Sequence, residues 1–527
     1  MTAGQVKSNG SACDPADDKF LALFSALASS PHEPVEVIET HAARVYLAGP
    51  KAYKMKKRVK LPYLDFSSLD ARQRMLLREL ELNCGHAPEI YIGVMPISRA
   101  SDGSLALGHD GEIIDYALVM NRFEQDSVLA RVAGSGPLSP PLSRALAEMV
   151  AAYHRCAAIA RDADGAGIML ATIAQLADEL ADAKGASTAS AAARFRDLSF
   201  QELGAISSLL NQRGSSGHVR RCHGDLHLGN IVLLSGRPVP FDALEFDERL
   251  ATIDVLYDLA FLIMDLDFRG DRAAANLVLN SYIGAAPVGG ELDGLKCLPL
   301  FLATRAAIRA VVASQRARQQ PIAKSADDAR AAGRYLNAAN TYLKPPRPSL
   351  VAVGGLSGTG KSTLGAALAP HIGPAPGALH LRSDVERKRH FGVAETERLT
   401  AQHYSEAISG TVYRILLEKA ESALKAGHAV IIDAVAAKRS ERDQMAALAQ
   451  RTGAVFAGLW LECPFATMVE RVAARHGDAS DADAAVVAAQ SHYDIGKVTW
   501  AVIDARGAPA DLLEAARTQL RSAGLIP

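Results

Sequence analysis

The sequence predicts a multidomain fold, in which an α+β part is followed by an α/β part with a parallel sheet. Short strand-like runs joined by tight turns come first and give way to long alanine-rich helical stretches. Strands followed by helices indicate an antiparallel sheet with its helices in a separate region. After residue 344, apolar runs alternate with helical ones, which is typical of parallel strands covered on both faces. The length of 527 residues supports more than one core, because a single core stops growing at roughly 250–300 residues.

The composition excludes several classes of partner. The chain has 57 Lys and Arg against 58 Asp and Glu, a net charge of −1, so we expect no nucleic-acid partner. Its six cysteines form no CxxC pair, which argues against a disulfide framework or a zinc site. The first residues show no secretory signal, and the most apolar stretch, residues 255–266, is interrupted by two aspartates and is too short to span a bilayer. We therefore expect a cytoplasmic protein with small-molecule partners and no membrane, and the sequence leaves its oligomeric state open.

The first part of the chain is expected to form a two-lobed domain over residues 21–344, after a disordered tail over 1–20. The smaller lobe, about 21–125, is predicted to contain strands within 35–59, a helix at 68–83, and strands at 90–97 and 113–120. The helix ends before Gly85 and Pro88, because both residues interrupt helices. From Leu142 onward apolar residues recur at helical spacing, which predicts a helical lobe over about 126–344.

The second part is expected to begin after a proline-rich linker at 345–348 and to cover residues 349–527. Proline stops any helix that precedes it, so the composition marks a boundary here. The predicted strands, each followed by a helix, are 350–355, 379–383, 429–435 and 455–462.

Residues 355–362, GLSGTGKS, match the phosphate-binding pattern GxxxxGK[ST] in full, between a predicted strand and a predicted helix. Glycines let backbone N–H groups wrap a phosphate at the positive end of a helix. Lys361 supplies charge to the β- and γ-phosphates, and the Ser362 hydroxyl ligates magnesium. The pattern therefore predicts ATP and Mg²⁺, bound by Gly355, Ser357, Gly358, Thr359, Gly360, Lys361, Ser362 and Thr363.

Carboxylates follow two further strands of this second part. Asp384 comes just after the second strand, where a carboxylate can orient an acceptor hydroxyl and take its proton. Asp433 ends the third strand, as a carboxylate for the magnesium shell does, with a helix N-cap as the alternative. We expect Asp384 to be catalytic and Asp433 to be a metal ligand.

Basic residues complete the predicted site of the second part. Arg471 and Arg475 lie four apart, which predicts that both project from one helix face. If this helix forms a lid over the bound nucleotide, both arginines are catalytic, because they stabilise charge on the transferring phosphoryl group. The alternative is a surface helix whose arginines form ion pairs. Arg387 and Lys388 bind an anionic acceptor or form a solvated basic face. This part resembles the small-molecule kinases of the P-loop class, such as the gluconate, shikimate and zeta-toxin-type kinases.

Residues 223–230, HGDLHLGN, with Asp242 further on, form a second constellation. Their order resembles the protein-kinase catalytic core, in which an Asp accepts the acceptor proton, while an Asn and a later Asp hold magnesium. The spacing is similar to that of the aminoglycoside phosphotransferase family, together with choline and homoserine kinases. The resemblance implies a protein-kinase-like fold, with Asp225 as the catalytic base and with Asn230 and Asp242 as metal ligands.

The resemblance also implies a lysine that holds the nucleotide phosphates. Lys54 in AYKMKK matches the kinase Ala-x-Lys pattern, and Lys56 is the alternative. The expected ion-pair partner of the lysine is Glu79, and Glu81 is the second choice. Both carboxylates lie in the predicted helix at 68–83.

This part departs from protein kinases in two ways. No glycine-rich loop precedes the second strand, and the metal motif reads FDALEF rather than DFG, but neither change removes a carboxylate. Asp254 and Asp258 match a downstream family motif and are expected to brace the catalytic loop. Arg305 and Arg309 are expected to pair with acidic side chains, with an anionic acceptor as the alternative.

Both parts together resemble a bacterial two-domain family in which an aminoglycoside phosphotransferase domain is fused to a P-loop kinase domain. The resemblance implies a bifunctional ATP-dependent phosphotransferase, whose halves phosphorylate hydroxyls of a sugar, nucleoside or amino alcohol. One alternative makes the P-loop half an ATP-dependent regulatory switch. Another makes it a zeta-toxin-like sugar-nucleotide kinase restrained by the N-terminal half. A binding protein with decayed sites is the least favoured.

Overall fold

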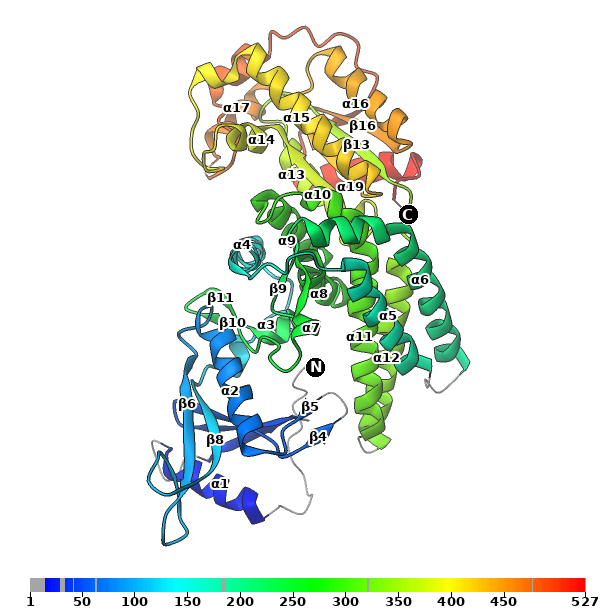
Figure 1. Cartoon of the computed structure of the whole chain (residues 1–527). Coiled ribbons are helices and arrows are strands. Elements are labelled where there is room, and N and C mark those ends of the chain that lie inside the picture. The colour runs from blue at the N-terminus through cyan, green and yellow to red at the C-terminus, as the bar shows by residue number, and fades with distance from the viewer. Residues whose placement is uncertain are drawn as a thin grey trace. The chain divides into compact units, whose positions relative to one another are not determined.

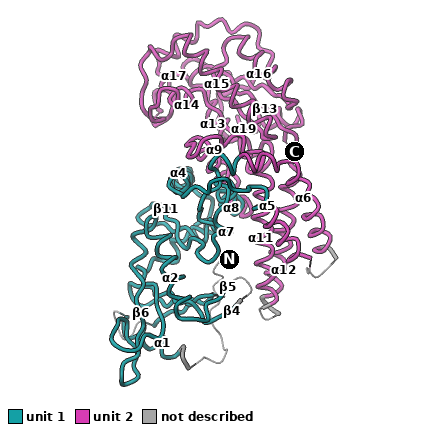
Figure 2. Tube along the Cα trace, in the orientation of Figure 1, with its two compact units in different colours: residues 1–168, 213–265 teal, residues 169–212, 266–527 magenta. Residues whose placement is uncertain are grey.

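The computed structural model of the chain describes residues 15–28, 34–40, 42–61, 64–181, 186–319, 322–475 and 477–526 (Figure 1). The chain divides into two compact units, Met1–Ile168 with Arg213–Asp265 and Met169–Gln212 with Leu266–Pro527 (Figure 2).

Helix α1 (Pro15–Ala26) begins inside the predicted tail. Proline suits the first turn of a helix, and Phe20 and Phe24 pack into the core of the neighbouring sheet. The disordered tail predicted over 1–20 is therefore wrong for residues 15–20. Residues 1–14 lie outside the described residues.

A six-stranded antiparallel sheet, in the order β1-β2-β3-β8-β6-β7, forms the small lobe of the first unit. Its strands are β1 (Glu36–Glu39), β2 (Ala43–Ala48), β3 (Lys51–Lys56), β6 (Tyr91–Arg99), β7 (Leu105–Leu107) and β8 (Glu112–Asn121). Side chains alternate between the faces of a strand, so Tyr53 and Met55 of β3 pack in the same cluster as Phe24 of α1. Lys54 and Lys56 point to the other face.

Helix α2 (Leu69–Cys84) covers that other face. Its first turn is capped by Ser68, whose hydroxyl accepts from the backbone N–H of Ala71. Leu76 of α2 packs with Leu118 of β8 in the core between helix and sheet. The helix therefore brings its carboxylates to the face that carries the two lysines.

Shorter elements complete the first unit. Antiparallel pairs form between β4 (Lys60–Leu61) and β5 (Leu64–Asp65), β9 (Val219–Arg221) and β12 (Thr252–Asp254), and β10 (Ile231–Leu234) and β11 (Arg237–Pro240). The helices are η1 (Gln125–Ser127), α3 (Leu129–Val132), α4 (Pro140–Cys156), η2 (Leu228–Asn230), α7 (Glu248–Ala251) and α8 (Val255–Phe268). The HGDLHLGN segment thus lies between two strands, β9 and β10.

The second unit contains a helical part. Its helices are α5 (Gly165–Ala181), α6 (Ala186–Ser215), α9 (Arg272–Ala285), α10 (Glu291–Gly294), η3 (Leu295–Cys297), α11 (Leu298–Gln319) and α12 (Ile322–Tyr342). Among the described residues, one helical stretch, Glu291–Arg318, is long and apolar enough to cross a membrane by length and composition. Because 72% of its most apolar window is buried inside the structure, burial in a protein core accounts for that composition.

A parallel five-stranded sheet, in the order β14-β15-β13-β16-β17, forms the rest of the second unit. Its strands are β13 (Ser349–Gly354), β14 (Leu379–Arg382), β15 (Val430–Asp433), β16 (Val455–Glu462) and β17 (Ala501–Asp504). The first four strands confirm the prediction of a parallel sheet. Strand β17 is an addition: its sequence, AVID, has only three apolar residues, and of its four residues only Ile503 is buried.

Helices cover both faces of this sheet, as predicted. Val351 and Val353 of β13 pack with α13 (Lys361–Leu368) and α19 (Pro509–Ser522). The alternate residues of β13 are buried too, on the face of α15 (Glu406–Lys425) and α16 (Arg439–Thr452). The remaining helices are η4 (Ala369–His371), α14 (Ser383–His390), η5 (Ala401–Tyr404), α17 (Phe465–Ala473) and α18 (Ala484–Gln490).

The edge strand β14 is bonded by side chains of α9 rather than by a further strand. The Asn280 side-chain oxygen accepts from the backbone N–H of His380 at 2.7 Å. The side-chain amides of Asn276 and Asn280 both donate to the carbonyl of Ala378. These bonds satisfy backbone groups that an edge strand otherwise leaves open.

Candidate active sites

Two lysines of β3 and one glutamate of α2 form the centre of the first site. Lys54 Nζ lies 2.6 Å from Glu79 Oε1 and 2.6 Å from Asp242 Oδ1. Lys56 Nζ lies 2.7 Å from the other oxygen of Glu79 and 2.6 Å from Glu245 Oε1. Each ammonium group therefore has two carboxylate partners, and Glu79 is shared between them.

The residues that the sequence left as alternatives occupy different environments. Glu79 is fully buried. The Glu81 side chain, in contrast, is 68% exposed and pairs with a surface arginine. Glu79 is thus the partner of Lys54. Of the two lysines, Lys54 is the one that contacts Asp242, while the Lys56 side chain is 2% exposed and turned to Glu245.

Asp242 follows β11 in a strained backbone conformation. Its φ of 61° lies in the left-handed region, which non-glycine residues adopt mainly at functional sites. Its backbone N–H donates to the hydroxyl of Tyr91 at 3.0 Å. Burial raises the pKa of the Asp242 carboxyl, but the Lys54 ammonium outweighs it and holds that pKa below its usual range. Asp242 therefore stays ionised, as a metal ligand must.

Asp225 and Asn230 lie together in the segment between β9 and β10. The Asn230 amide donates at 3.0 Å to both the carbonyl and the carboxylate Oδ2 of Asp225. His227 Nε2 lies 3.6 Å from the same carboxylate, and all three side chains are buried. Amide and carboxylate oxygens are ligands that Mg²⁺ prefers, so the site's residue types fit such an ion.

Asp258, at the start of α8, fixes the backbone of this segment. Its carboxylate accepts from the backbone N–H groups of His223 at 3.2 Å and Gly224 at 2.9 Å. His154 Nε2 lies 3.1 Å from it as well. Asp258 therefore braces the loop, as predicted, whereas Asp254 pairs with Arg213 through two bonds of 2.6 and 2.8 Å.

The second site is built around the loop between β13 and α13. Gly358 and Gly360 have φ values of 85° and 93°, which glycine adopts without steric cost. A side chain at Gly358 would lie 2.6 Å from the carbonyl oxygen of Met468. Lys361 donates to the carbonyl of Leu356 at 3.0 Å, and burial lowers its pKa. The loop thus presents a partly buried lysine and a helix N-terminus to one cavity of about 1600 Å³.

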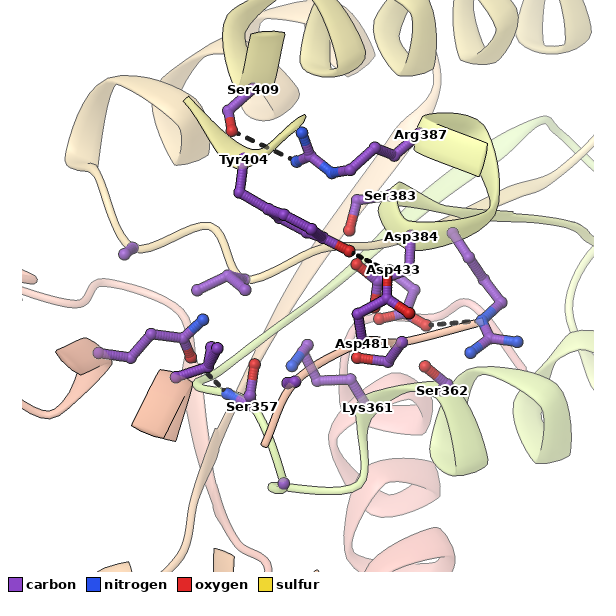
Figure 3. A pocket seen from close by; sticks show the side chains of 18 of the residues that line it. Ser357, Lys361, Ser362, Ser383, Asp384, Arg387, Tyr404, Ser409, Asp433 and Asp481 are labelled. Atoms are coloured by element: carbon purple, nitrogen blue, oxygen red, sulfur yellow. Dashed lines mark hydrogen bonds and ion pairs between the residues drawn. The ribbon is translucent and has the colours of Figure 1, made fainter. Parts of the chain in front are cut away.

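Six of the eight predicted loop residues line this cavity together with Asp384, Asp433, Arg471 and Arg475, whereas Gly355 and Thr359 are not part of its lining. Figure 3 shows Lys361, Asp384 and Asp433 converging on it from three different elements. Their strands β13, β14 and β15 are neighbours, and parallel strands end at the same edge of a sheet. Within the loop, the N–H of Ser357 donates to Gln490 Oε1 at 2.8 Å, so α18 contacts the loop directly.

Asp433 is the last residue of β15, and the next helix begins only at Arg439, so the helix-cap alternative is wrong. His380 Nε2 lies 3.5 Å and Arg382 Nε 3.6 Å from Asp433 Oδ2. Burial raises the pKa of Asp433, but His380 and Lys361 outweigh it and bring that pKa to about 2. This carboxylate stays charged and suits a magnesium shell.

Asp384 has the opposite shift. Burial raises the pKa of the Asp384 carboxyl, and the negative charge of the neighbouring Asp433 raises it further. The hydrogen bond from the Ser480 hydroxyl to Asp384 lowers that pKa but does not cancel the rise. Two carboxylates of one pocket whose pKa values move apart suit different tasks, one a proton acceptor and the other a permanent anion.

The predicted lid helix is shorter than expected. Helix α17 ends at Ala473, so the expectation that Arg471 and Arg475 project from one helix face is wrong. Arg475 lies beyond the helix and pairs with Asp478 at 3.5 Å, while Arg471 donates to the carbonyl of Gly507 at 3.4 Å. Both nevertheless line the same cavity.

Arg387 and Lys388 of α14 are buried, so the solvated basic face is wrong. Lys388 is fully buried and pairs with Asp481 at 2.6 Å. Arg387 donates to the carbonyl of His403 at 2.9 Å and to the Ser409 hydroxyl at 3.3 Å. Its guanidinium lies 4.6 Å from the ring centre of Tyr404, and within the described chain it has no carboxylate partner.

Several residues of the two sites carried no sequence prediction. Arg382 stands at the carboxyl end of β14, a position that parallel sheets use for ligands, and that position was its signal. Glu245 lies inside the FDALEF segment, which was read for Asp242 alone, and the other residues lie outside recognisable motifs: Tyr91, Tyr404, Ser480, Asp481 and Gln490. The two arginines of α11 that the sequence analysis singled out have these environments: Arg305 is buried, and the Arg309 guanidinium lies 5.8 Å from the Tyr335 ring centre.

Comparisons with known proteins match two separate stretches of the chain, on either side of residues 345–348. The phosphotransferase enzyme family matches residues 76–295, and an AAA domain family matches residues 350–493. The protein Rv2004c of Mycobacterium tuberculosis (strain ATCC 25618 / H37Rv) is 31% identical over 474 residues, which cover 88% of this chain and 91% of that protein. The chain belongs to the same family. It joins an aminoglycoside phosphotransferase domain to a P-loop kinase domain.

Solved structures are similar to parts of this chain. A choline/ethanolamine kinase family protein from Mesorhizobium loti is similar to 61% of this chain and 98% of its own, with 15% identity and a TM-score of 0.38. A sugar kinase from Janibacter sp. HTCC2649 is similar to 34% of this chain and 99% of its own, with 23% identity and a TM-score of 0.26.

Proposed function

We propose that the chain is a bifunctional ATP-dependent small-molecule kinase with Mg²⁺ as its cofactor. One observation carries the proposal: each domain assembles a partly buried lysine, an ionised carboxylate of metal-ligand type and a separate carboxylate. In the first these are Lys54, Asp242 and Asp225, and in the second Lys361, Asp433 and Asp384. Kinases on unrelated folds need these same parts. We place the domain boundary at the linker 345–348 and the reaction in the cytoplasm.

In the aminoglycoside phosphotransferase domain, Lys54 would bind the nucleotide phosphates while Glu79 orients it. Bound Mg²⁺ would neutralise charge on the phosphates, held by Asn230 and Asp242. Asp225 accepts the proton of the acceptor hydroxyl while the hydroxyl oxygen forms a bond to the γ-phosphorus. The bond from that phosphorus to the bridging oxygen of ADP then breaks.

In the P-loop kinase domain, the loop residues would hold the phosphates, with Ser362 and Asp433 beside the magnesium ion. Asp384 takes the acceptor proton, and its raised pKa makes it a better base than an ordinary carboxylate. Arg471 and Arg475 offset negative charge on the transferring phosphoryl group. The products are ADP and a phosphate ester of the acceptor.

The acceptor of the P-loop domain carries an anionic group. Arg387 is buried, its Nε has no hydrogen-bond partner, and it lacks a carboxylate partner within the described chain. A buried cation without a counter-ion is costly, so a carboxylate or phosphate of the acceptor would complete it. Tyr404 supports this arrangement, because its ring packs against the guanidinium.

A second candidate is the regulatory switch, favoured by the bonds from Asn276 and Asn280 to β14. The strand they hold leads directly to Arg382 and Asp384. A switch would bind and hydrolyse ATP without stimulation by any acceptor. A restrained sugar-nucleotide kinase would instead phosphorylate only sugar nucleotides.

The test is phosphorylation of a panel of sugars, sugar acids, nucleosides, sugar nucleotides and amino alcohols by the full-length chain. Asp225→Asn should abolish one set of products and Lys361→Ala another, each leaving the other set intact. Glu81→Gln, on the surface of α2, is the control and should change neither. If neither active-site substitution affects any product, the bifunctional assignment is wrong.

A further inference from the structure

One carboxylate, Asp481, joins three separate segments around the pocket of the P-loop domain. It accepts from the hydroxyl of Tyr404 at 2.6 Å and from the backbone N–H of Leu399 at 3.0 Å. Lys388 Nζ lies 2.8 and 2.6 Å from its two oxygens. We define the flap as residues 391–405, between α14 and α15, and the lid as residues 477–490, which follow α17. Asp481 thus ties the lid to the flap.

The lid also contacts the nucleotide side of the pocket. Gln490 accepts from the N–H of Ser357 in the phosphate-binding loop. Asp478 binds Arg382 at 2.6 Å, and the Ser480 hydroxyl bonds to Asp384. The same short segment therefore contacts the loop, the proposed base and, through its neighbour Asp481, the flap.

The flap, in turn, shapes the acceptor side. Tyr404 lies over the guanidinium of Arg387, and the carbonyl of His403 accepts from that guanidinium. Figure 3 shows the Tyr404 hydroxyl directed at Asp481 and the ring beside Arg387. Moving Asp481 with the lid would therefore move the aromatic wall and the backbone that hold the unpaired cation.

We propose that Asp481 is a positioning residue that couples the acceptor side of this pocket to its nucleotide side. The proposal rests on the function proposed above for the same site. When nucleotide at the loop orders the lid, Asp481 orders the flap, and Arg387 is presented for an anionic acceptor. Nucleotide and acceptor then bind with positive cooperativity, because the ligand that binds first already orders the lid and the flap, and the second ligand binds without that loss of conformational entropy.

Hydrogen exchange of the flap amides in the full-length chain, with and without MgADP, tests this coupling. The N–H of Leu399 is a direct reporter, since Asp481 is its acceptor. In the wild type, MgADP should slow exchange in residues 391–405 at least about fivefold, the lower end of usual coupling between sites. Lys361→Ala should abolish this response, which identifies the loop as its source.

Asp481→Asn should still bind MgADP but lose the slowing in the flap. Asp483→Asn is the matched control: it lies on the same segment, caps α18 through Val486, and should respond like the wild type. Tyr404→Phe removes a single hydroxyl and leaves the buried Lys388–Asp481 pair in place. It should lose part of the response, and it decides the matter if Asp481→Asn fails to fold.

A merely structural role for Asp481 would lower stability without changing the response to MgADP. The coupling is therefore overturned if the flap responds in Asp481→Asn or Tyr404→Phe as strongly as in the wild type. It is also overturned if MgADP binds in a Lys361-dependent manner and the wild-type flap does not respond. Calorimetry that detects no Lys361-dependent MgADP binding would instead overturn the nucleotide site, and the coupling with it.

Discussion

Replacing Asp384 by asparagine tests the proposed base of the P-loop domain with little change in shape. The amide has nearly the size of the carboxylate and can still accept the hydrogen bond of Ser480, but it cannot accept the acceptor proton. A positioned general base contributes typically about 10²–10⁴-fold to the rate. Phosphoryl transfer by this domain should fall by that factor, measured in an Asp225→Asn background that silences the first site.

The same substitution should raise stability near neutral pH. Because burial raises the folded-state pKa of Asp384, folding favours the protonated carboxyl, and its stabilising contribution is lost as the pH rises through that value. Asparagine does not ionise. We therefore expect a higher Tm than the wild type near pH 8, and a gap that closes as the pH approaches the ordinary carboxyl value of about 3.9.

The pH–rate profile of the wild type gives a third readout. Asp433 keeps its charge down to a pKa of about 2, so the acid limb should belong to Asp384, with activity lost as the pH falls through its raised pKa. Asp443→Asn, on the exposed face of α16, is the control. A variant that keeps more than a tenth of the wild-type rate refutes Asp384 as the base. A lower Tm than the wild type near pH 8 refutes the argument from burial.

Three further substitutions have defined outcomes. Glu79→Gln should lower the free energy of unfolding in urea by roughly 1–3 kcal/mol, because two buried ammonium groups each lose one of two charged partners. Arg387→Met should raise the KM for acceptors with a carboxylate or phosphate by roughly ten- to hundredfold, the worth of a charged hydrogen bond, and leave neutral polyols unaffected. Asp258→Ala should lower the free energy of unfolding by about 1–3 kcal/mol, because two buried N–H groups of the catalytic segment lose their acceptor.

Matched controls separate these effects from general damage. Glu81→Gln makes the same chemical change on the same helix, but its exposed ion pair is worth at most about 1 kcal/mol. If Glu79→Gln is no more costly than Glu81→Gln, the shared carboxylate does not stabilise the lysine pair. Equal KM increases for neutral and anionic acceptors in Arg387→Met would contradict the anion assignment.

The fold and the phosphate loop could be predicted because their signals are local. The glycines, Lys361 and Ser362 of the P-loop lie within eight consecutive residues, so one short motif determines both the backbone geometry and the chemistry of the loop. The period of apolar residues distinguished the antiparallel sheet from the parallel one, because strands buried on both faces need continuous apolar runs. The short strand β17 has an apolar run of only three residues and was missed.

The acceptor side of the pocket could not be predicted for a physical reason. Helix α14 has eight residues, SDVERKRH, with one apolar residue, so no periodic stripe indicates which basic side chain is buried. Around Arg387 and Lys388, the flap before η5 and the lid before α18 have irregular backbone, and the partner Asp481 lies 93 residues from Lys388. Local pattern determines neither the loop path nor this pairing, and the end of α17 before Arg475 is the same kind of failure.

The two lysines that define the sites differ in a way that bears on how each domain meets its nucleotide. Lys54 already has two carboxylate partners, which hold its pKa well above the usual range although burial lowers it. Lys361 is partly buried, has no ion pair within the described chain, and has a pKa that burial lowers. Phosphate therefore supplies Lys361 with a missing counter-charge, whereas in the first site it must displace Asp242 from Lys54. Since Mg²⁺ would take over the freed Asp242 carboxylate, nucleotide binding to the first site should depend on magnesium more steeply than binding to the P-loop.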